Sequence, residues 1–388
     1  MSTVKDAIGQ AVDQLAGELE TLSRTIHDHP ELGYQETRAA GWLAEFLGRH
    51  GFDVERGVGG VETAFRATLQ TGDGPTIAIL CEYDALPGIG HACGHNVIAA
   101  AGAGAGAALA ERRGQLPRGR VLVIGTPAEE GGGGKIRLIQ AGVFKDVDCA
   151  MMIHGFDRTL LHQDLLGIVR ATFEFTGKAA HASADPWAGV NALDACVQTY
   201  TAISMLRQQM RPDCRVHGII TSGGAAPNII PESAATTFLV RAPEIDRMWE
   251  LHRRVVACAE AAARATGATL KLSQPDNVYE PLRRNQTLLD LFAANMATAG
   301  LKEGEPIPDR LGSSDIGNVS QVIPAIQPMI GITPTGMAIH TRDFAEAAVK
   351  PLAVSGLLAA AKTMAMTTYD LLADPARVAA AKQEFARR

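Results

Sequence analysis

The chain has 388 residues, of which 46% are hydrophobic and 20% are charged, a composition typical of a folded globular protein rather than a disordered or fibrous one. This length exceeds that of one ordinary core, so we expect two domains. The net charge of −6 and the scattered Lys and Arg residues argue against a nucleic-acid partner.

The sequence also argues against secretion and against a membrane span. The N-terminus lacks a basic head followed by an apolar core. The longest apolar run, residues 97–110, is shorter than the roughly 20 residues that a span requires. We expect a cytoplasmic protein with reduced thiols, because no regular disulfide framework is visible among cysteines 81, 93, 149, 196, 214 and 258.

The first half of the chain alternates helical and β-rich patterns. Apolar residues at steps of three and four predict one helix over residues 4–27, and a second helix is expected at about 36–50. The runs that follow are alternately β-rich and helical, at 76–83, 97–112, 120–126, 134–141 and 148–153. This alternation predicts an α/β domain with a mostly parallel sheet that is covered on both faces.

The pattern changes after Leu166. Strand, helix, strand, strand, helix and strand are predicted in turn, at 167–176, 189–210, 215–222, 234–241, 244–266 and 268–273. The order β-α-β-β-α-β is that of a ferredoxin-like sandwich. We therefore expect an inserted domain at 168–280, within a first domain made of residues 1–167 and 281–388. The returning segment includes an expected strand at 322–332 and a closing helix at 346–372.

The loop from His91 to Asn96 brings two imidazoles and a thiol close together after a buried strand. Cys93 and His95 lie two positions apart, so an extended or tightly turned backbone would direct both side chains to one side. Gly94 between them permits the turn. This spacing indicates a shared divalent ion.

Other polar residues of interest follow the ends of the predicted parallel strands. Asp84 follows the first strand, Glu129 and Glu130 follow the second, and His154 ends the third. Ligands of open α/β sheets bind at this edge, so these side chains can converge. One of the two adjacent glutamates could hold a metal while the other faces a metal-bound water. Together with His340 there are enough candidate ligands for two ions that share a bridging group; they are Cys93, His95, Glu130, His154 and His340.

Several motifs together resemble the aminoacylase and carboxypeptidase G family of co-catalytic metallopeptidases, in its amidohydrolase branch. They are His29-Pro-Glu-Leu-Gly33, Asp84-Ala-Leu-Pro87, Gly90-His-Ala-Cys-Gly-His-Asn96, Pro127-Ala-Glu-Glu-Gly-Gly132, His154, Gly177-Lys-Ala-Ala-His-Ala-Ser183, Ala226-Pro-Asn-Ile-Ile-Pro231 and His340. The resemblance implies a di-metal α/β domain interrupted by a ferredoxin-like dimerisation domain, and hence a homodimer. It also implies that the first of these motifs holds no ligand.

The same resemblance implies a role for each candidate residue. Cys93 would bridge two metal ions, and the remaining ligands would be His95, Glu130, His154 and His340. Glu129 would be the general base, and Asp84 would orient a ligand histidine. His181 would stabilise the oxyanion, reaching the active site of the partner subunit. Asn228 would hydrogen-bond the substrate, and Arg241 is a candidate for an anionic group.

Two sequence differences from most members of this branch indicate which subgroup the chain resembles. Many members have Asp where this chain has Asn96, and Asp-Met-Asp where it has Glu82-Tyr83-Asp84. With Gly312-Ser-Ser-Asp-Ile-Gly-Asn-Val-Ser320, these changes resemble the p-aminobenzoyl-glutamate hydrolase and aminoacylase-like dipeptidase subgroup. Zinc suits the Cys/His-rich ligand set, and manganese or cobalt are alternatives.

We therefore expect a homodimeric, metal-dependent amidohydrolase that cleaves an N-acyl or N-aminoacyl amino acid, such as an aminobenzoyl-glutamate-like amide or a dipeptide. One alternative is a specialised deacylase of a conjugate or toxin amide with the same fold. Another is a non-catalytic ligand-binding homologue. A thiol hydrolase in which Cys93 is the nucleophile and His95 its partner is also conceivable, and chelator sensitivity would separate it from a metalloenzyme.

Overall fold

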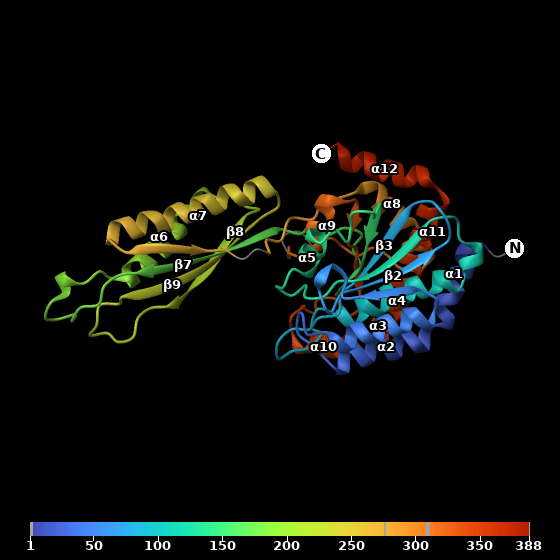
Figure 1. Ribbon diagram of the computed structural model, residues 1–388, viewed down its shortest axis with the longest axis horizontal. Helices are drawn as coiled ribbons and strands as arrows, with labels where there is room; N and C mark the ends of the chain where they lie inside the picture. The colour runs from blue at the N-terminus through green and yellow to red at the C-terminus, as the bar shows by residue number, and fades with distance from the viewer. Residues whose placement is uncertain (1–2, 275–276, 308–310, 388) are drawn as a thin grey trace. The chain divides into compact units, whose positions relative to one another are not determined.

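The computed structural model describes residues 3–274, 277–307 and 311–387, and the chain forms two compact units (Figure 1). The first unit comprises Met1–Gln163, Leu282–Pro308 and Asp315–Arg388. The second comprises Asp164–Pro281 and Asp309–Ser314. We expected the shorter of these two segments to be part of the first domain, with the rest of residues 281–388. The second unit is thus an insertion into the sequence of the first. Its role in dimerisation stays a prediction.

A six-stranded sheet lies at the centre of the first unit, in the order β1-β2-β4-β3-β5-β11. Its strands are β1 (Asp53–Arg56), β2 (Phe65–Gln70), β3 (Thr76–Cys81), β4 (Arg120–Gly125), β5 (Cys149–Met151) and β11 (Ala325–Ile326). Strand β3 pairs in parallel with β4 and β5, and β5 pairs in parallel with β11, whereas β1 and β2 add an antiparallel edge. Every residue of β3 is buried, as a strand covered on both faces requires. The prediction of a mostly parallel α/β sheet is confirmed.

Helices surround this sheet. Strands β6 (His154–Phe156) and β12 (Met329–Gly331), which follow β5 and β11 in the chain, form a separate two-stranded sheet. The helices are α1 (Val4–Gln14), α2 (Ala16–Asp28), α3 (Thr37–Arg49), α4 (His95–Ala110), α5 (Gly134–Gln140), α8 (Gln286–Thr298), α9 (Ile316–Val322), α10 (Arg342–Ala347), α11 (Pro351–Ala373) and α12 (Pro375–Ala386). None of the helices in the described part of the chain is both long and apolar enough to cross a membrane.

Helix α4 is buried from His95 to Leu109 and packs against β3 and α11 (Figure 1). Its glycines permit this close approach. A Cβ atom added at Gly102 would lie 2.5 Å from Cys81 Sγ, and one added at Gly104 would lie 2.7 Å from Leu19 Cδ1. The first turn of α4 is thereby fixed in the interior, beside the ends of the parallel strands.

Two predicted elements differ from the structure. The expected helix over 4–27 is two helices separated at Leu15, whose backbone stays in the right-handed helical region, so the buried apolar stripe continues across the break. The expected strand over 322–332 is the end of α9 and the two short strands β11 and β12. Pro324 and Pro328 lack the N–H groups that a continuous strand would need.

The second unit is a four-stranded antiparallel sheet in the order β10-β7-β9-β8, with α6 and α7 packed on it. Its elements are β7 (Gly167–Thr176), α6 (Ala192–Leu206), β8 (Arg215–Ser222), β9 (Ser233–Ala242), α7 (Ile245–Thr266) and β10 (Thr269–Ser273). Phe173, Phe175 and Phe238 lie in its buried core. The predicted β-α-β-β-α-β sandwich is confirmed.

Candidate metal centre

Polar side chains gather at the carboxyl ends of β3, β4 and β5, as expected for an open α/β sheet. Asp84 follows β3, while Glu129 and Glu130 follow β4. His154 begins β6, three residues after β5 ends. All four side chains belong to the first unit.

The loop before α4 delivers two further candidates, Cys93 and His95. Gly94 caps the helix in the left-handed region, with φ at 74°, where a β-carbon would also meet Ile332 Cδ1 at 2.6 Å. His95 is the first residue of α4 and is fully buried. His91 stays outside the ligand groups, because its Nε2 faces the Ile26 carbonyl oxygen at 3.2 Å.

Two groups of potential metal ligands share the sulfur of Cys93. One consists of Cys93, His95 and His154, and the other of Cys93, Glu130 and His340; within each group the ligand atoms lie within 4.8 Å of one another. His340 Nε2 is 2.9 Å from Cys93 Sγ and 3.6 Å from Glu130 Oε1. The structure therefore brings together all five residues that we expected to be ligands.

Asp84 connects two of these residues through its two oxygens. The Nδ1 of His95 lies 3.1 Å from Asp84 Oδ1 and 2.9 Å from the Asp84 carbonyl oxygen, and the N–H of Glu130 donates to Oδ2 at 2.9 Å. Burial alone would raise the pKa of Asp84, but the neighbouring positive charge and hydrogen bond of His95 bring that pKa below its ordinary value. Asp84 is therefore an ionised acceptor that orients a histidine.

The histidine tautomers fit a bound cation. A carbonyl oxygen can only accept, so His95 Nδ1 donates to Asp84 and His154 Nδ1 donates to Gly155 at 2.8 Å. The Nε2 atoms are the ones that would bind a metal. Without a metal, burial would lower the pKa of His95, but the charge and hydrogen bond of Asp84 outweigh it and raise that pKa well above its ordinary value, so a bound metal would replace the proton on its Nε2. Burial lowers the pKa of His154 to about 4, which keeps its ring neutral at pH 7. No hydrogen-bond partner within the described ranges reaches the buried Nε2 of His95 or Oε1 of Glu130.

The excess of buried carboxylates around Glu129 also favours a bound cation. Burial first, and then repulsion from Glu82 and Glu130, raise the pKa of Glu129 well above its ordinary value. A divalent cation would offset this surplus of buried negative charge. Thiolate, imidazole and carboxylate together form a donor set that suits zinc and also accommodates other first-row divalent ions. The residues present therefore fit a divalent-metal centre.

Two non-glycine residues of the site, Ala128 and His340, have backbone in the left-handed region. Ala128, immediately before Glu129, has φ at 58°, and its N–H donates to the buried Glu36 Oε1 at 2.8 Å. His340 has φ at 62°, and its own N–H donates to the Ala92 carbonyl oxygen at 2.9 Å. Left-handed backbone at non-glycine residues costs free energy and is concentrated at functional sites. Here it aims a carboxylate and an imidazole at the ligand cluster.

Three predicted residues, His181, Asn228 and Arg241, belong to the second unit. His181 and Asn228 come from loops that lie together, because the Ala182 N–H donates to the Asn228 carbonyl oxygen at 3.0 Å. The Nδ1 of His181 lies 3.3 Å from the Ser183 backbone N and 3.2 Å from that of Ala184. It therefore accepts hydrogen bonds, and the ring proton of the neutral imidazole is on Nε2.

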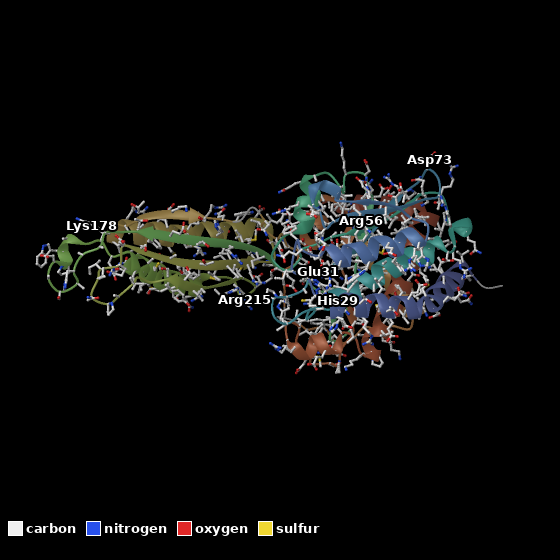
Figure 2. The ribbon with its side chains drawn as sticks, turned by 60° about the horizontal axis from the view of Figure 1, so that its bottom comes forward. His29, Glu31, Arg56, Asp73, Lys178 and Arg215 are labelled. Carbon is white, nitrogen blue, oxygen red and sulfur yellow. The ribbon has the colours of Figure 1, made fainter. Side chains whose placement is uncertain are left out.

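Arg241 lines a cavity of about 360 Å³ within the second unit. Its Nη1 donates to Ser313 Oγ at 3.0 Å, and its buried Nε has no hydrogen-bond partner among the described residues. Arg215, which Figure 2 labels, and His217 also line this cavity. The carboxylate of Asp213 lines it too, so the cavity combines two arginines and a histidine with one acidic group.

Three buried residues beside the ligand cluster have no role in the sequence-based expectations. Glu82, Lys135 and Asp315 are fully buried and form ion pairs. Glu82 and Asp315 occur in two segments that mark the departures from the branch, so the sequence contained a signal for them. Lys135 carried no such signal, because it follows a run of glycines that resembles an exposed turn.

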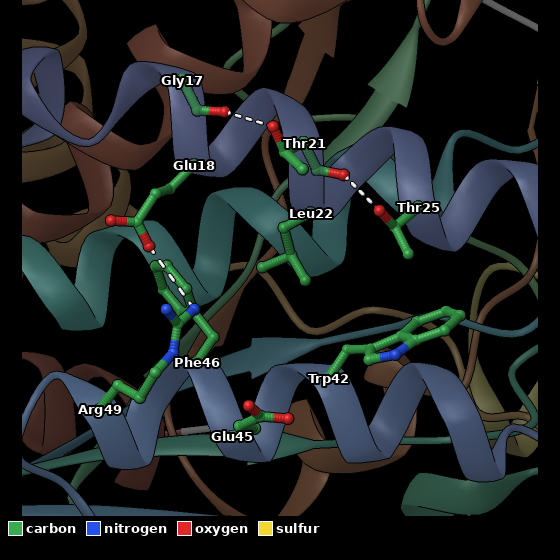
Figure 3. A pocket seen from close by; sticks show the side chains of 9 residues that line it. All are labelled: Gly17, Glu18, Thr21, Leu22, Thr25, Trp42, Glu45, Phe46 and Arg49. Atoms are coloured by element: carbon green, nitrogen blue, oxygen red, sulfur yellow. Dashed lines mark hydrogen bonds and ion pairs between the residues drawn. The ribbon is translucent and has the colours of Figure 1, made fainter.

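Other features lie apart from the cluster. His29 is exposed, as Figure 2 shows, and its Nδ1 faces the Thr25 carbonyl oxygen at 2.9 Å. A groove of about 520 Å³ runs between α2 and α3, with Leu22, Trp42 and Arg49 among its lining residues (Figure 3). None of the residues that line this groove belongs to the ligand groups.

Comparison with known proteins agrees with this site. A family model described as peptidase family M20/M25/M40 matches residues 78–363. The Xaa-Arg dipeptidase of Mus musculus is 40% identical, over 99% of this chain and 93% of the relative. One of the chains of the p-aminobenzoyl-glutamate hydrolase of Escherichia coli K12 is 30% identical, over 99% of this chain and 95% of the relative.

The fold recurs in solved structures. A dinuclear metal-binding peptidase of the M20 family from Bacillus subtilis superposes with a TM-score of 0.71 at 22% identity, over 92% of this chain and 99% of that chain. The predicted resemblance to the metallopeptidase family, and to the dipeptidase and aminobenzoyl-glutamate hydrolase subgroup, is confirmed. The chain therefore belongs to peptidase family M20/M25/M40, and it is a hydrolase of the amide bond in acyl or aminoacyl amino acids.

Proposed function

We propose that this chain is a di-metal dipeptidase in which Cys93 is shared by two ions and Glu129 is the general base. The observation that carries the proposal is the pair of ligand groups that meet at Cys93. His95 and His154 would complete one site, while Glu130 and His340 would complete the other. Zinc is the ion that this donor set suits best, with manganese or cobalt as alternatives.

The metal ligands, Glu129 and Asp84 would have different roles in hydrolysis. Divalent ions bound here would polarise the amide carbonyl and lower the pKa of water. Glu129, whose Oε2 lies 3.9 Å from His95 Nε2, accepts the proton of the attacking water and returns it to the departing amine. Asp84 accepts hydrogen bonds from His95 and from the Glu130 N–H, which fixes the positions of these two ligands relative to Glu129.

His181 is assigned to the oxyanion of the tetrahedral intermediate. Its Nδ1 is occupied by backbone N–H groups, so its exposed ring offers the Nε2–H as a donor. Following the family resemblance, we assign this donor to the active site of the partner subunit. Asn228, next to it in the second unit, would hydrogen-bond the substrate. Replacement of His181 by Ala should lower kcat about 10²-fold, and the metal content should not change.

Arg241 is assigned to an anionic group of the substrate, for which the carboxylate of a dipeptide is suited. The buried Nε of this partly buried side chain has no hydrogen-bond partner among the described residues, and Arg215 and His217 outnumber Asp213 in the same cavity, which supports this assignment. Arg241→Lys keeps the charge but loses the planar fork, so it should raise KM more than it lowers kcat. An unchanged KM would remove Arg241 from the substrate site.

We favour dipeptides with a basic C-terminal residue as substrates, because the 40% identical mouse protein is an Xaa-Arg dipeptidase and spans nearly the whole chain. Aminobenzoyl-glutamate is the second candidate, in view of the 30% identical Escherichia coli hydrolase. The two candidates place opposite charges on the C-terminal side chain, so they can be distinguished by one assay.

The test is amine release from Xaa-Arg and neutral dipeptides, N-acyl amino acids and aminobenzoyl-glutamate. The protein is stripped by a chelator and reloaded with zinc, manganese or cobalt. Metal-restored release of arginine would support the favoured substrate class, while release of glutamate alone would select the second. Activity that survives complete metal removal would overturn the proposal in favour of Cys93 as a nucleophile.

We also propose that two copies associate through β8 and α6 of the second unit. Strand β8 is an edge of its sheet, and Ile219 and Met205 are 65% and 66% exposed. The helix and the strand are neighbours, because Tyr200 OH donates to the Gly218 carbonyl oxygen at 3.3 Å. An edge strand beside exposed apolar side chains is a surface suited to pairing with another copy.

Sedimentation analysis tests this interface. The double variant Ile219→Lys with Met205→Glu should sediment as a monomer, whereas the wild-type chain should sediment as a dimer. Leu272→Lys, on β10 at the opposite edge of the sheet, is the matched control, since Leu272 is 37% exposed. A dimer that persists in the double variant would place the interface elsewhere.

For the location of the protein we propose the cytoplasm. All six cysteines are free thiols, and five of them are buried. Free thiols without a disulfide framework suit a reducing compartment. Cell fractionation would test this, and recovery in a secreted fraction would contradict it.

A further inference from the structure

Three charged residues form a buried cluster directly beside the candidate metal centre. Glu82 follows β3, Lys135 lies in the first turn of α5, and Asp315 precedes α9. Lys135 Nζ is 2.5 Å from Glu82 Oε1 and 2.6 Å from Asp315 Oδ1, and the Lys135 N–H donates to Asp315 Oδ2 at 3.0 Å. All three side chains are completely enclosed. Lys135 therefore binds three of the four carboxylate oxygens.

The fourth oxygen, Glu82 Oε2, is buried and has no hydrogen-bond partner among the described residues. It lies 3.6 Å from His95 Nε2, which is itself buried and without a hydrogen-bond partner in the same ranges. A buried carboxylate oxygen that is left unsatisfied is costly. The two atoms are within ion-pair distance when His95 is protonated but beyond hydrogen-bonding distance, a spacing that also suits a cation in place of the Nε2 proton.

A divalent cation is the species that suits both atoms. His95 Nδ1 is already held by Asp84, so Nε2 is the ring atom that would bind a cation in place of its proton, and Glu82 Oε2 presents negative charge. A nitrogen and an oxygen bound to one tetrahedral ion at about 2.0–2.2 Å lie roughly 3.4 Å apart. The observed separation of 3.6 Å is close to this value.

We propose that Glu82 is an additional metal ligand, which binds through Oε2 the same ion as His95 and is aimed by Lys135. This inference rests on the proposed metal centre and adds a carboxylate to the five ligands of the family resemblance. Lys135 fixes the orientation by holding Oε1, so that Oε2 alone is directed at the ion. Both oxygens of Asp315 accept from Lys135, so we assign Asp315 no ligand role, although it lies close enough to Glu82 and Glu129 to share an ion with them.

The test measures metal binding rather than turnover. Chelator-stripped wild-type protein, Glu82→Gln and Asp315→Asn are titrated with zinc, and bound metal is counted after equilibrium dialysis. Gln can still accept from Lys135, but it directs an amide N–H or an uncharged oxygen at His95. We expect one of the two ions to bind at least tenfold more weakly to Glu82→Gln, and both to bind normally to Asp315→Asn.

A second readout is the visible spectrum of the cobalt-loaded protein, which responds to the ligands of the ion. We expect it to change in Glu82→Gln and to stay as in the wild type in Asp315→Asn. If Glu82→Gln does not fold, Glu82→Asp replaces it. This variant keeps the charge beside Lys135 but withdraws the oxygens by one methylene, so the same weakening is expected.

The outcomes separate this inference from the proposal on which it rests. A wild-type chain that binds no ion would remove the metal centre itself. Two ions bound with wild-type affinity by the Glu82 variant would refute only the role of Glu82. Equal weakening in the Glu82 variant and in Asp315→Asn would show that the cluster acts through structure alone, and it would also overturn the inference.

Discussion

The Nε2 atom of His340 lies 2.9 Å from the Sγ atom of Cys93, although 247 positions separate the two residues in the sequence. The left-handed backbone of His340 and its hydrogen bond to the Ala92 carbonyl oxygen create this contact. A loop from the first half of the chain and a turn near its end are thus joined at one sulfur. Removal of that sulfur should therefore affect both halves of the site.

Cys93→Ala should cause loss of bound metal, because the shared ligand of both groups disappears. We expect fewer than two ions per chain by elemental analysis after gel filtration, and activity that falls in proportion. Cys258→Ser is the matched control, since Cys258 is a free thiol in the second unit and outside the ligand groups. Two ions retained by Cys93→Ala would show that the sulfur bridges nothing.

Glu129→Gln should abolish turnover and leave the metal content intact. Gln keeps the shape of the side chain but cannot accept a proton, and a positioned general base contributes about 10²–10⁴-fold to rate. The measurement is kcat for the best dipeptide together with metal content. Loss of metal in this variant would instead make Glu129 a ligand.

Asp84→Asn should weaken metal binding about 10–100-fold. The two oxygens of Asp84 accept from His95 Nδ1 and from the Glu130 N–H, and an amide can offer an oxygen to only one of them. The remaining NH₂ group would then face another donor. Competition with a chromophoric chelator measures the affinity, and an unchanged value would contradict the positioning role.

Glu36 should make the folded state less stable as pH rises. Burial, and next the charge of Asp84, raise the pKa of Glu36 from 4.5 to about 7, so the folded chain holds this proton more tightly than the unfolded chain. Stability from this group is complete below about pH 4.5 and is lost as pH rises towards 7. The cost above that range is on the order of 3 kcal/mol.

Glu36→Gln removes this dependence, because Gln does not ionise and can still accept from the Ala128 N–H. Urea unfolding of the metal-free protein at pH 5 and pH 8 measures the effect. The variant should gain stability over the wild type at pH 8 and much less at pH 5. Glu45→Gln, on the exposed side of α3, is the control. Equal pH dependence of Glu36→Gln and wild type would contradict the prediction.

The sequence could predict those parts of the site that follow from strand ends. Buried parallel strands are continuous apolar runs, so the run through Cys81 located β3, and Asp84 was placed at the edge where its neighbours converge. The spacing of Cys93 and His95 indicated a metal for a local reason. These inferences needed no knowledge of contacts across the chain.

Other parts depend on tertiary contacts that no local pattern encodes. Lys135 is fully buried only because Glu82 and Asp315, from two other segments, neutralise it. An isolated lysine after glycines is far more often on the surface. The raised pKa of Glu36 likewise depends on burial among distant segments. Strands β1 and β2 also escaped prediction. Strand β1 has four residues and is mostly exposed at the sheet edge, while β2 alternates buried and partly exposed residues and is no continuous apolar run.

The inserted position of the second unit also has a consequence for biosynthesis. Strands β11 and β12, which pair with β5 and β6, and the ligand His340 are all translated after the inserted segment. A nascent chain that ends before residue 282 therefore has an incomplete sheet in the first unit and lacks His340, the one histidine of the group that also contains Cys93 and Glu130. Domains generally fold in the order of their synthesis. Here the inserted unit can fold first. The full set of metal ligands is present only after His340, in the final quarter of the chain, has emerged from the ribosome.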